Sequence, residues 1–449
     1  MLAQTHELTG DQFQEIILEE YGPAGEQLGF DASEVVAAFA PDPERAEQSY
    51  AELDVQGIRF SSYRHQVGVL DEQDRSRGGC ELSEDVTGEK ILHKAVTMEA
   101  KHLLAQTGNV GGKSGILATR EELEAIGPKG RRELFAQHAE AHDINPYTNV
   151  VATDIGTYGP DMDAIAEALV PEYGQYAGAA ASGASAKYGG EPELHAPRTG
   201  LGASIVLDRY LHSIADSNPR VAEAIEGGRP LRVLIQGLGK AGAHFLNTMP
   251  DYIQPAGALE QHGSIVVPDG YMDRAQLLAA ARATKLNESS RSDFNNARWM
   301  PPEARAAFWA SNGIDILAPA FDRNQIDEQD VFTFAQDGTV IASIANGPIT
   351  PEGLEAAAYL QLDELPDAVT NVGGTISSQG IADKIMGKPG WTPASYERSW
   401  RAAVTRVADT TIETRAKLSA EIGQFVPLDR AANLIVVQRA VQRLRQLKG

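Results

Sequence analysis

The sequence contains a single cysteine, Cys80, among 449 residues. One thiol cannot form an intramolecular disulfide, so nothing in the sequence indicates an oxidising compartment. Basic residues are also scarce, because 39 Lys and Arg stand against 62 Asp and Glu, which gives a net charge of −23. Nucleic acids are bound by dense Lys/Arg surfaces, so we expect no nucleic-acid partner.

Long apolar runs are absent as well. The chain has no run of the roughly 18 apolar residues that a membrane span requires, and no basic segment leads into an apolar one at its start. We therefore expect a cytoplasmic protein with no membrane partner. With 42% hydrophobic residues, the chain is long enough to form two or three domains around large cores.

The first part of the chain mixes helical and strand-like segments. Residues 9–54 show helical periodicity, and residues 51–70 include short segments typical of strands. A further helix is predicted over residues 85–106. Residues 172–197 are rich in Gly, Ala and Ser, and this composition predicts a long loop or hinge between two domains.

A lysine between glycines is the most prominent local feature of the sequence. Residues 108–115 are Gly-Asn-Val-Gly-Gly-Lys-Ser-Gly, which predicts a loop that presents Lys113. Surrounding walls can withdraw such a lysine from water, which suits proton transfer or attack on a carbonyl, although a solvated surface turn is the commoner outcome for so short a motif. Lys101 lies twelve residues earlier, and two cations in one cleft would suit a carboxylate-bearing substrate.

An aspartate follows the next strand-like segment. The apolar run in residues 149–153 predicts a buried strand, and Asp154 comes directly after it, before a glycine-containing loop. Proteins of the α/β class present catalytic groups at the ends of strands, so Asp154 is a candidate catalytic carboxylate. A helix N-cap or a turn is the alternative role for an isolated aspartate in this position.

Strand and helix alternate after residue 200, and a dinucleotide fingerprint lies at the start of this region. The predicted strand 231–236 runs directly into Gly237, Gly239 and Gly242, spaced as GxGxxG before a helical segment. These glycines allow a tight turn, close approach of a pyrophosphate and close packing of helix on strand. Glu260 is the candidate acid for the adenosine ribose hydroxyls, which favours NAD over NADP.

Further segments complete this alternation. Strands are predicted at residues 314–320 and 339–345, and the second leads to Asn346, whose amide could bond a nicotinamide ribose. Another strand is predicted over residues 368–378, opening into a Gly-Gly pair. From about residue 395 to its end the chain is predicted to be helical.

Taken together, these segments resemble the glutamate/leucine/phenylalanine/valine dehydrogenase family, and most closely its glutamate dehydrogenase branch. The resemblance spans about residues 30 to 449. It rests on motifs that occur in the family's order: Arg77-Gly78-Gly79, Met98-Glu99-Ala100-Lys101, Gly111-Gly112-Lys113, Asp154-Ile155-Gly156-Thr157, Asp161-Met162-Asp163, Arg198-Thr199-Gly200, Gln236-Gly237-Leu238-Gly239, Ala345-Asn346-Gly347-Pro348 and Asn371-Val372-Gly373-Gly374.

The resemblance implies an α/β fold with two domains. Residues 1–197, completed by the C-terminal helices in residues 375–449, would form a domain for substrate binding and oligomerisation. Residues 198–374 would form a Rossmann domain, with the catalytic cleft between the two. The implied reaction is the reversible oxidative deamination of an L-amino acid to a 2-oxo acid and ammonia with NAD or NADP, and the implied assembly is a homo-oligomer, with a hexamer as the best guess.

The resemblance also implies roles for individual residues. Lys113 resembles the lysine that polarises the carbonyl oxygen and activates water, Asp154 resembles the general acid/base, and Lys101 resembles the partner of the substrate α-carboxylate. The remaining implied contacts are Arg77, Gly79 and Ser378 with the substrate, and Thr199, Asn346 and Asn371 with nicotinamide and its ribose. No metal ion is expected.

Several positions depart from the family pattern. Arg77 replaces the lysine that grips the side-chain carboxylate of glutamate, and it keeps the charge, which favours an acidic substrate. Glu81 stands where the family usually has arginine, Asn109-Val110 replaces a Pro-aromatic pair, and Ser114 replaces Gly. These changes leave open a dehydrogenase for a different L-amino acid. A relative that binds a dinucleotide without catalysis is the other alternative.

Overall fold

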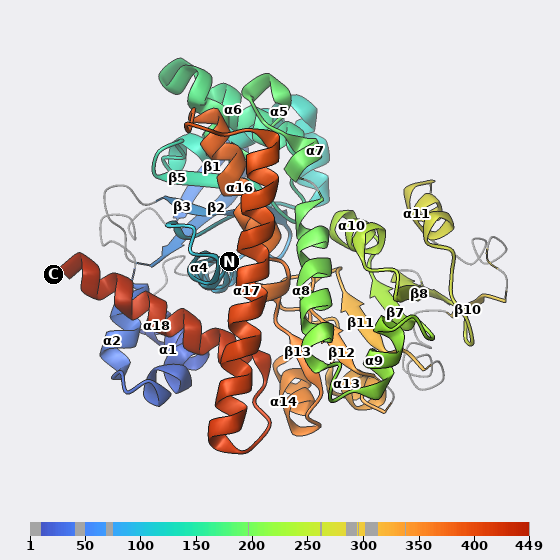
Figure 1. Cartoon of the computed structure of the whole chain (residues 1–449). Coiled ribbons are helices and arrows are strands. Elements are labelled where there is room, and N and C mark those ends of the chain that lie inside the picture. Colours follow the sequence, from blue (N-terminus) through green and yellow to red (C-terminus); the bar gives the residue numbers. More distant parts are fainter. Residues whose placement is uncertain are drawn as a thin grey trace. The chain divides into compact units, whose positions relative to one another are not determined.

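The structure is a computed structural model (Figure 1). It describes residues 10–40, 50–68, 75–195, 197–260, 263–283, 294, 296–300, 313–336 and 338–448. The chain forms two compact units: unit 1 contains residues 1–195, 375–400 and 433–449, and unit 2 contains residues 196–374 and 401–432. Within the described ranges, no helix is both long enough and apolar enough to cross a bilayer.

Unit 1 is a mixed α/β unit, and its first part consists of helices followed by alternating strands and helices. In chain order these are α1 (Gly10–Gln27), α2 (Ala32–Phe39), β1 (Tyr50–Val55), β2 (Ile58–Val67), β3 (Ser76–Ser83), α4 (Gly88–Ala105), β4 (Val110–Leu117), α5 (Arg120–Ala141), β5 (Asn149–Thr153), α6 (Gly159–Tyr173), η1 (Gly174–Ala180), β6 (Ala181–Ser182), η2 (Ala186–Tyr188) and α7 (Pro192–His195). The helix predicted over residues 85–106 is therefore confirmed as α4.

The sheet of unit 1 has the strand order β1-β2-β4-β3-β5-β6, in which β4, β3, β5 and β6 are parallel. Helix α4 covers one face, and α5 and α6 cover the other (Figure 1). The main core lies on the α5/α6 side, where Cys80 and Ile116 pack against Phe135 and Ile165. Because side chains alternate along a strand, the residues next to Cys80 point to the α4 face.

The predicted loop at residues 108–115 is wrong, because this stretch enters strand β4. Its glycines make room for neighbouring elements rather than for a turn. A Cβ at Gly111 would lie 2.3 Å from the carbonyl oxygen of Ala95 on α4, and one at Gly112 would lie 2.3 Å from Oγ of Ser76 on β3. Lys113 therefore sits on a packed strand.

The long loop predicted at residues 172–197 is also wrong, although the chain does pass from unit 1 to unit 2 within this stretch, after residue 195. This stretch completes α6 and forms η1, β6, η2 and α7. Its small residues allow close backbone contacts, since a Cβ at Gly178 would lie 1.9 Å from the carbonyl oxygen of Tyr188, and one at Gly190 would lie 1.9 Å from that of Ala184. Composition alone does not separate this use of glycine from a flexible linker.

Unit 2 contains a second sheet, with strand order β10-β9-β8-β7-β11-β12-β13. Strands β8, β7, β11, β12 and β13 are parallel, and β9 and β10 add an antiparallel edge. The elements are α8 (Arg198–Ile214), α9 (Pro219–Ile225), β7 (Leu231–Gln236), α10 (Lys240–Thr248), β8 (Ile253–Glu260), β9 (Gly263–Val266), α11 (Arg274–Ala283), β10 (Arg298–Met300), β11 (Ile316–Pro319), α13 (Glu328–Phe334), β12 (Val340–Ala342), α14 (Pro351–Tyr359), β13 (Asp363–Leu365) and α15 (Asp367–Thr370).

Strand β7 lies between β8 and β11 in this order. After β7 the chain forms β8 on one side of it, and later forms β11 on the other side. In open parallel sheets, ligands bind beyond the carboxyl ends of the strands where the strand order reverses in this way. The strands predicted at residues 231–236, 314–320 and 339–345 are confirmed as β7, β11 and β12.

The strand predicted at residues 368–378 is wrong, because α15 is followed by α16 (Val372–Ile385). Pro366 precedes the first turn of α15, and the Gly-Gly pair lets α8 approach closely. A Cβ at Gly202 of α8 would lie 3.1 Å from Cα of Gly373, and one at Gly374 would lie 2.7 Å from Oγ1 of Thr199.

The C-terminal part is helical as predicted, with α17 (Pro393–Ile422) and α18 (Leu428–Lys448). Residues 401–432 belong to unit 2, whereas the sequence assigned them to the substrate domain. The reason lies in the side chains of α17, since Arg415 donates to Asp363 Oδ1 at 2.7 Å and Asp409 accepts from Arg209 Nε at 2.8 Å. Periodicity predicts a helix, and it does not predict which unit the helix packs against.

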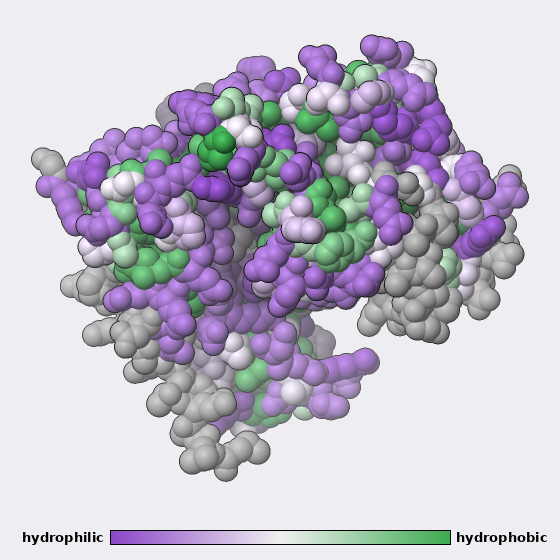
Figure 2. Space-filling view, turned by 90° about the horizontal axis from the view of Figure 1, so that it is seen from below, coloured by the Kyte–Doolittle hydropathy of each residue, from purple (hydrophilic) through white to green (hydrophobic). Residues whose placement is uncertain are grey.

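The surface drawn in Figure 2 is mainly hydrophilic, with apolar residues in separate groups. Large exposed apolar side chains of the described residues include Tyr359, Tyr158 and Phe321. This distribution is in keeping with the excess of acidic residues in the composition.

Candidate active site

The candidate catalytic residues of unit 1 gather on the α4 face of its sheet. Strand register places Arg77, Gly79 and Glu81 of β3 on the same face as Lys113 of the neighbouring parallel strand β4. Asp154 directly follows β5, the strand on the other side of β3. The topology thus brings residues that are far apart in sequence to one face of three adjacent strands.

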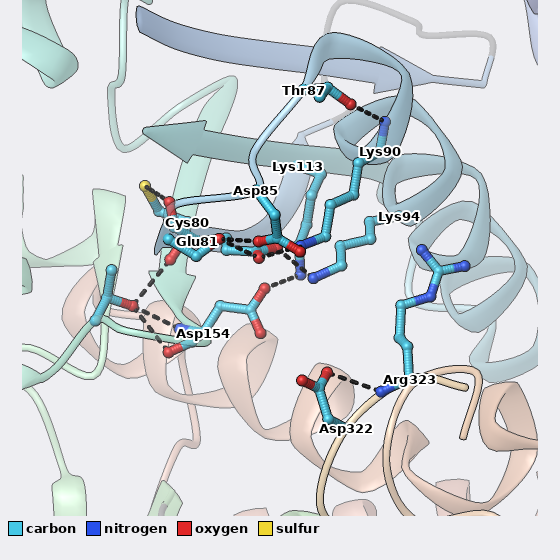
Figure 3. A network of polar contacts seen from close by, with 12 residues as sticks. Cys80, Glu81, Asp85, Thr87, Lys90, Lys94, Lys113, Asp154, Asp322 and Arg323 are labelled. Atoms are coloured by element: carbon cyan, nitrogen blue, oxygen red, sulfur yellow. Dashed lines mark hydrogen bonds and ion pairs between the residues drawn. The ribbon is translucent and has the colours of Figure 1, made fainter. Parts of the chain in front are cut away.

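Lys113 and Asp154 form an ion pair between Nζ and Oδ2 (Figure 3). Lys113 is buried, and the side chain of Asp154 is 13% exposed. The backbone amide of Asp154 donates to Oγ1 of Thr157 at 2.7 Å, and this hydroxyl lies 2.9 Å from the carbonyl oxygen of Cys80, to which it donates. These bonds fix the carboxylate at the end of β5.

The protonation state of Asp154 results from opposing effects. Burial raises the pKa of this carboxyl, but the nearby charges of Lys113 and Lys94 and the bond from Lys113 outweigh burial and lower the pKa to about 2. Asp154 is therefore ionised at neutral pH. In this state the carboxylate carries a negative charge that can pair with the ammonium group of a bound substrate.

Gly79 supplies the space that Asp154 occupies. A Cβ at position 79 would lie 2.8 Å from Cβ and 3.1 Å from Cγ of Asp154. Any larger side chain would displace the carboxylate of Asp154 from its present position beside Lys113. Glycine at position 79 therefore determines the position of Asp154.

Glu81 is fully engaged by groups of the protein. Its Oε1 accepts from Lys90 Nζ at 2.7 Å and from Ser83 Oγ at 2.8 Å, and its Oε2 pairs with Lys94 Nζ. Burial raises the pKa of Glu81, but Lys94, Lys90 and Ser83 lower it below its usual value. The negative charge at position 81 is therefore paired with two lysines of α4.

Arg77 is a buried cation, and its guanidinium has no hydrogen-bond partner in the part of the chain that the structure describes. It is 2% exposed, and its Nε, Nη1 and Nη2 are all buried and unpaired. Burial and the charge of Arg75 lower its pKa to about 9, and Asp383 of α16 acts in the opposite sense. It remains charged at neutral pH. A buried charge without a partner is costly, so this guanidinium is suited to an anion that a ligand brings.

The other two candidate substrate residues of unit 1 are buried. Lys101 lies on α4 next to His102 and is 3% exposed. Ser378 lies on α16, and its hydroxyl is 2.6 Å from that of Ser182. Asp383, whose charge acts on Arg77, lies on the same helix as Ser378.

The unusual residues around Lys113 contact the protein. Asn109 Nδ2 donates to Gln379 Oε1 at 2.7 Å, and Val110 is fully buried. Ser114 points away from Lys113, because neighbours on a strand face opposite sides, and it accepts from Nη1 of the buried Arg64 at 2.7 Å. These substitutions therefore reflect packing and internal hydrogen bonding.

In unit 2, the glycines of the fingerprint have the geometry of a dinucleotide turn. Gly237 follows β7 with φ +86°, and a Cβ at Gly242 would lie 1.9 Å from the carbonyl oxygen of Gly237. Gly239 is the N-cap of α10, has no side-chain cap, and would bear a Cβ that meets nothing within 4 Å. The open space at this helix N-terminus fits a pyrophosphate.

Glu260 ends β8, the strand beside β7. Its Oε1 accepts from the backbone amide of Leu238 at 2.7 Å, so the carboxylate lies against the glycine turn. This position fits contact with ribose hydroxyls of a dinucleotide bound at that turn.

The three candidate nicotinamide contacts lie near one another in unit 2. Asn371 Nδ2 donates to Asn346 Oδ1 at 3.0 Å and to the carbonyl oxygen of Ile344 at 3.1 Å. A Cβ at Gly374, three residues after Asn371, would lie 2.7 Å from Oγ1 of Thr199. The amide groups are thus held together beyond the end of β12.

Sequence reasoning assigned no role to two charged residues of α4. One is Lys94, which lies one heptad before Lys101 and so points to the same side of the helix; that spacing is visible in the sequence, but it does not predict the ion pair of Lys94 with Glu81. The other is Glu99, which accepts from the backbone amide of Gly111 at 2.6 Å and from Arg443 of α18 at 3.2 Å. No local pattern connects Arg443 with Glu99, since 344 residues separate them.

Comparison with known proteins agrees with this geometry. The NADP-specific glutamate dehydrogenase A1 of Halobacterium salinarum is 24% identical over 434 residues, which cover 95% of this chain and 96% of the relative. Valine dehydrogenase of Streptomyces virginiae is 24% identical over 78% of this chain and 80% of its own length. The hetero-hexameric glutamate dehydrogenase of Thermus thermophilus, solved in a Leu-bound form, shares the fold with a TM-score of 0.73 at 20% identity, covering 99% of both chains.

A family model assigns the chain more directly. The model for Glutamate/Leucine/Phenylalanine/Valine dehydrogenase matches residues 189–449, which is more than half of the chain. Together with the parallel sheet, the glycine turn and the Lys113–Asp154 pair, this match leads to one conclusion. The chain belongs to the glutamate/leucine/phenylalanine/valine dehydrogenase family, and its activity class is that of an amino-acid dehydrogenase.

Proposed function

We propose that the chain is a glutamate dehydrogenase that catalyses the reversible oxidative deamination of L-glutamate to 2-oxoglutarate and ammonia. One observation carries the choice of an acidic substrate: the buried guanidinium of Arg77, whose three nitrogens have no partner among the described residues. An apolar amino acid would leave this charge buried and unpaired. The side-chain carboxylate of glutamate would pair with it in two parallel hydrogen bonds.

In the proposed mechanism, Asp154 and Lys113 move the protons. Asp154 is ionised and accepts a proton from the substrate amino group. The Lys113 ammonium stabilises the oxygen of the adding water and of the 2-oxo acid, and Lys101 pairs with the α-carboxylate. Ser378 donates to the side-chain carboxylate. Each of these residues belongs to unit 1.

We propose that unit 2 binds NAD, which when bound supplies the oxidant for the amino acid. Gly237, Gly239 and Gly242 would receive the pyrophosphate, and Glu260 would receive the adenosine ribose. Thr199, Asn346 and Asn371 would hold the nicotinamide and its ribose. A carboxylate at position 260 repels a 2′-phosphate, which supports NAD over NADP.

The test of the substrate is a variant that removes the charge of Arg77 and keeps its volume. We expect Arg77→Met to raise the KM for L-glutamate by roughly a hundredfold or more, because a buried, charge-assisted pair is lost. Activity with L-methionine or L-norvaline should rise. Arg75→Met is the matched control, because it removes an adjacent, more exposed cation, and it should keep glutamate activity.

The competing candidate is a dehydrogenase for another L-amino acid, which the similarity to a valine dehydrogenase supports. A screen of the twenty amino acids with NAD and with NADP separates the two candidates. Turnover of valine or leucine without turnover of glutamate would reject the glutamate assignment.

We further propose that the chain forms a homo-oligomer, with a hexamer as the expected size. The similarity in fold to a hetero-hexameric glutamate dehydrogenase supports this assembly. Light scattering coupled to gel filtration measures it, and a mass equal to one 48.2 kDa chain would contradict it.

A further inference from the structure

Unit 1 contains a buried group of charges that the roles above do not fully use. We call it the lysine cluster: Glu81, Lys90, Lys94, Lys113 and Asp154. Two ion pairs join Glu81 to the two lysines of α4, and a third joins Lys113 to Asp154. Figure 3 shows these side chains converging from β3, α4, β4 and the end of β5.

Lys94 occupies the centre of this cluster. It is 4% exposed, and its ammonium reaches Glu81 while lying beside the ammonium of Lys113 and the carboxylate of Asp154 (Figure 3). The charged groups that face it are Glu81 from β3, Lys113 from β4 and Asp154 after β5. Burial and Lys113 lower the pKa of Lys94, whereas Asp154 and Glu81 raise it.

Lys90 differs from Lys94 in a way that is useful for testing. Both lysines bind Glu81, but Lys90 also pairs with Asp85 at 2.8 Å, whose side chain is 73% exposed. Lys90 therefore lies towards the solvent side of the cluster. Lys94 is the one of the two whose charge acts on Asp154.

We propose that Lys94 is a positioning residue of the dehydrogenase site, held in place by Glu81, and that its charge keeps Asp154 ionised in acidic solution and paired with Lys113. The proposal rests on the proposed function for its catalytic meaning. The expected effect of Lys94 on the protonation of Asp154 depends only on residues of this chain, so it can be measured without a substrate.

The buried carboxylate of Asp154 needs nearby positive charge to stay ionised. An ionised carboxylate loses hydration when it is buried, and this cost opposes ionisation of Asp154. Lys113 alone must serve both Asp154 and the substrate oxygen during the reaction. A second ammonium stabilises the carboxylate independently, and Glu81 balances that ammonium when no substrate is bound. The three lysines are thus balanced by three carboxylates, those of Glu81 and Asp154 within the cluster and that of Asp85, which pairs with Lys90.

The effects that set the protonation of Asp154 are consistent with this role. Burial raises the pKa of Asp154, and the charges of Lys113 and Lys94, in that order, lower it. Removing Lys94 should therefore raise the pKa of Asp154. An opposite charge at this range typically moves a carboxyl pKa by about 1 to 3 units.

The test compares Lys94→Met with Lys90→Met in the full-length protein. The first readout is the infrared carboxyl band of Asp154 without substrate, followed against pH and assigned by its loss in Asp154→Asn. We expect this band to titrate roughly 1 to 3 pH units higher in Lys94→Met than in wild type, and to be unmoved in Lys90→Met. The second readout is the pH profile of kcat/KM with the best amino-acid substrate, whose acidic limb should shift in parallel.

The double variant Glu81→Gln/Lys94→Met removes both members of the buried pair, so it provides a second test if Lys94→Met does not fold. It should show the same upward shift. An unmoved band in either folded variant, or an equal shift in Lys90→Met, would overturn the proposal. If wild type oxidises no amino acid, the proposed function fails, but the infrared titration still decides the role of Lys94.

Discussion

The close approach of Asp154 to Gly79 allows the loss of activity in Gly79→Ala to be predicted. In Gly79→Ala, the added Cβ would lie 2.8 Å from Cβ of Asp154, whereas ordinary van der Waals contact begins near 3.4 Å. The carboxylate must therefore retreat by roughly 0.6 Å. The substitution changes no charge and removes no hydrogen bond, so its effect on activity should come from this displacement.

Displacing a catalytic group by about 1 Å costs on the order of a hundredfold in rate. For a shift of roughly 0.6 Å we expect kcat/KM to fall by about ten- to a hundredfold, which corresponds to about 1.4 to 2.7 kcal/mol in the activation free energy. Steady-state kinetics with the best amino-acid substrate measures this loss. Tryptophan fluorescence and thermal unfolding check that the variant remains folded.

Gly115→Ala is the control on the same sheet. Its added Cβ would lie 2.5 Å from Cδ1 and 2.8 Å from Cγ1 of Ile91, and 2.8 Å from Cγ1 of Val86, so it crowds apolar side chains and does not press on Asp154. We expect kcat/KM to stay within a few-fold of wild type. A folded Gly79→Ala variant with wild-type kcat/KM would refute the claim that glycine at position 79 sets the place of Asp154.

Three further predictions concern the surroundings of the site. Ser114→Ala removes a hydrogen-bond acceptor from the buried Arg64, so the free energy of unfolding measured in urea should fall by about 1 to 3 kcal/mol. The KM for the amino acid should stay unchanged, and a changed substrate preference would show that Ser114 faces the substrate. Arg443→Met breaks a partly buried ion pair with Glu99, so the unfolding free energy should fall by about 1 to 3 kcal/mol in the same assay, and an unchanged value would contradict the tether. Glu260→Ser removes a carboxylate from the glycine turn, so kcat/KM with NADP should rise at least about tenfold relative to NAD, and an unchanged ratio would exclude Glu260 from the ribose site.

The fold could be predicted where local pattern and packing agree. The helix carrying Lys101, the strand before Gly237 and the C-terminal helices all show a clear period, and the structure has them. The errors fall where glycine serves close packing. In β4 and in α16, glycines make room for a neighbouring helix or strand, and sequence alone does not distinguish that use from a turn.

The site could be predicted only as far as motif order extends. The sequence identified Lys113 and Asp154 separately, and the structure brings them together on adjacent parts of one sheet. It did not predict that Glu81 would be neutralised by two lysines of α4, because that depends on which helix face covers the sheet. It also did not predict that Ser114 would accept from Nη1 of Arg64, because Arg64 lies fifty residues away in the chain.

The proposed function depends most on Lys113, which we expect to perform acid/base and electrostatic work in the oxidation of an acidic amino acid. The most direct measurement follows formation of NADH from NAD with L-glutamate, in wild type and in Lys113→Met. We expect turnover by wild type, a loss of at least about a thousandfold in kcat in the variant, and a nearly unchanged Kd for NADH in both. A folded wild-type protein that binds NADH and does not oxidise glutamate, or a Lys113→Met variant that retains full activity, would contradict it.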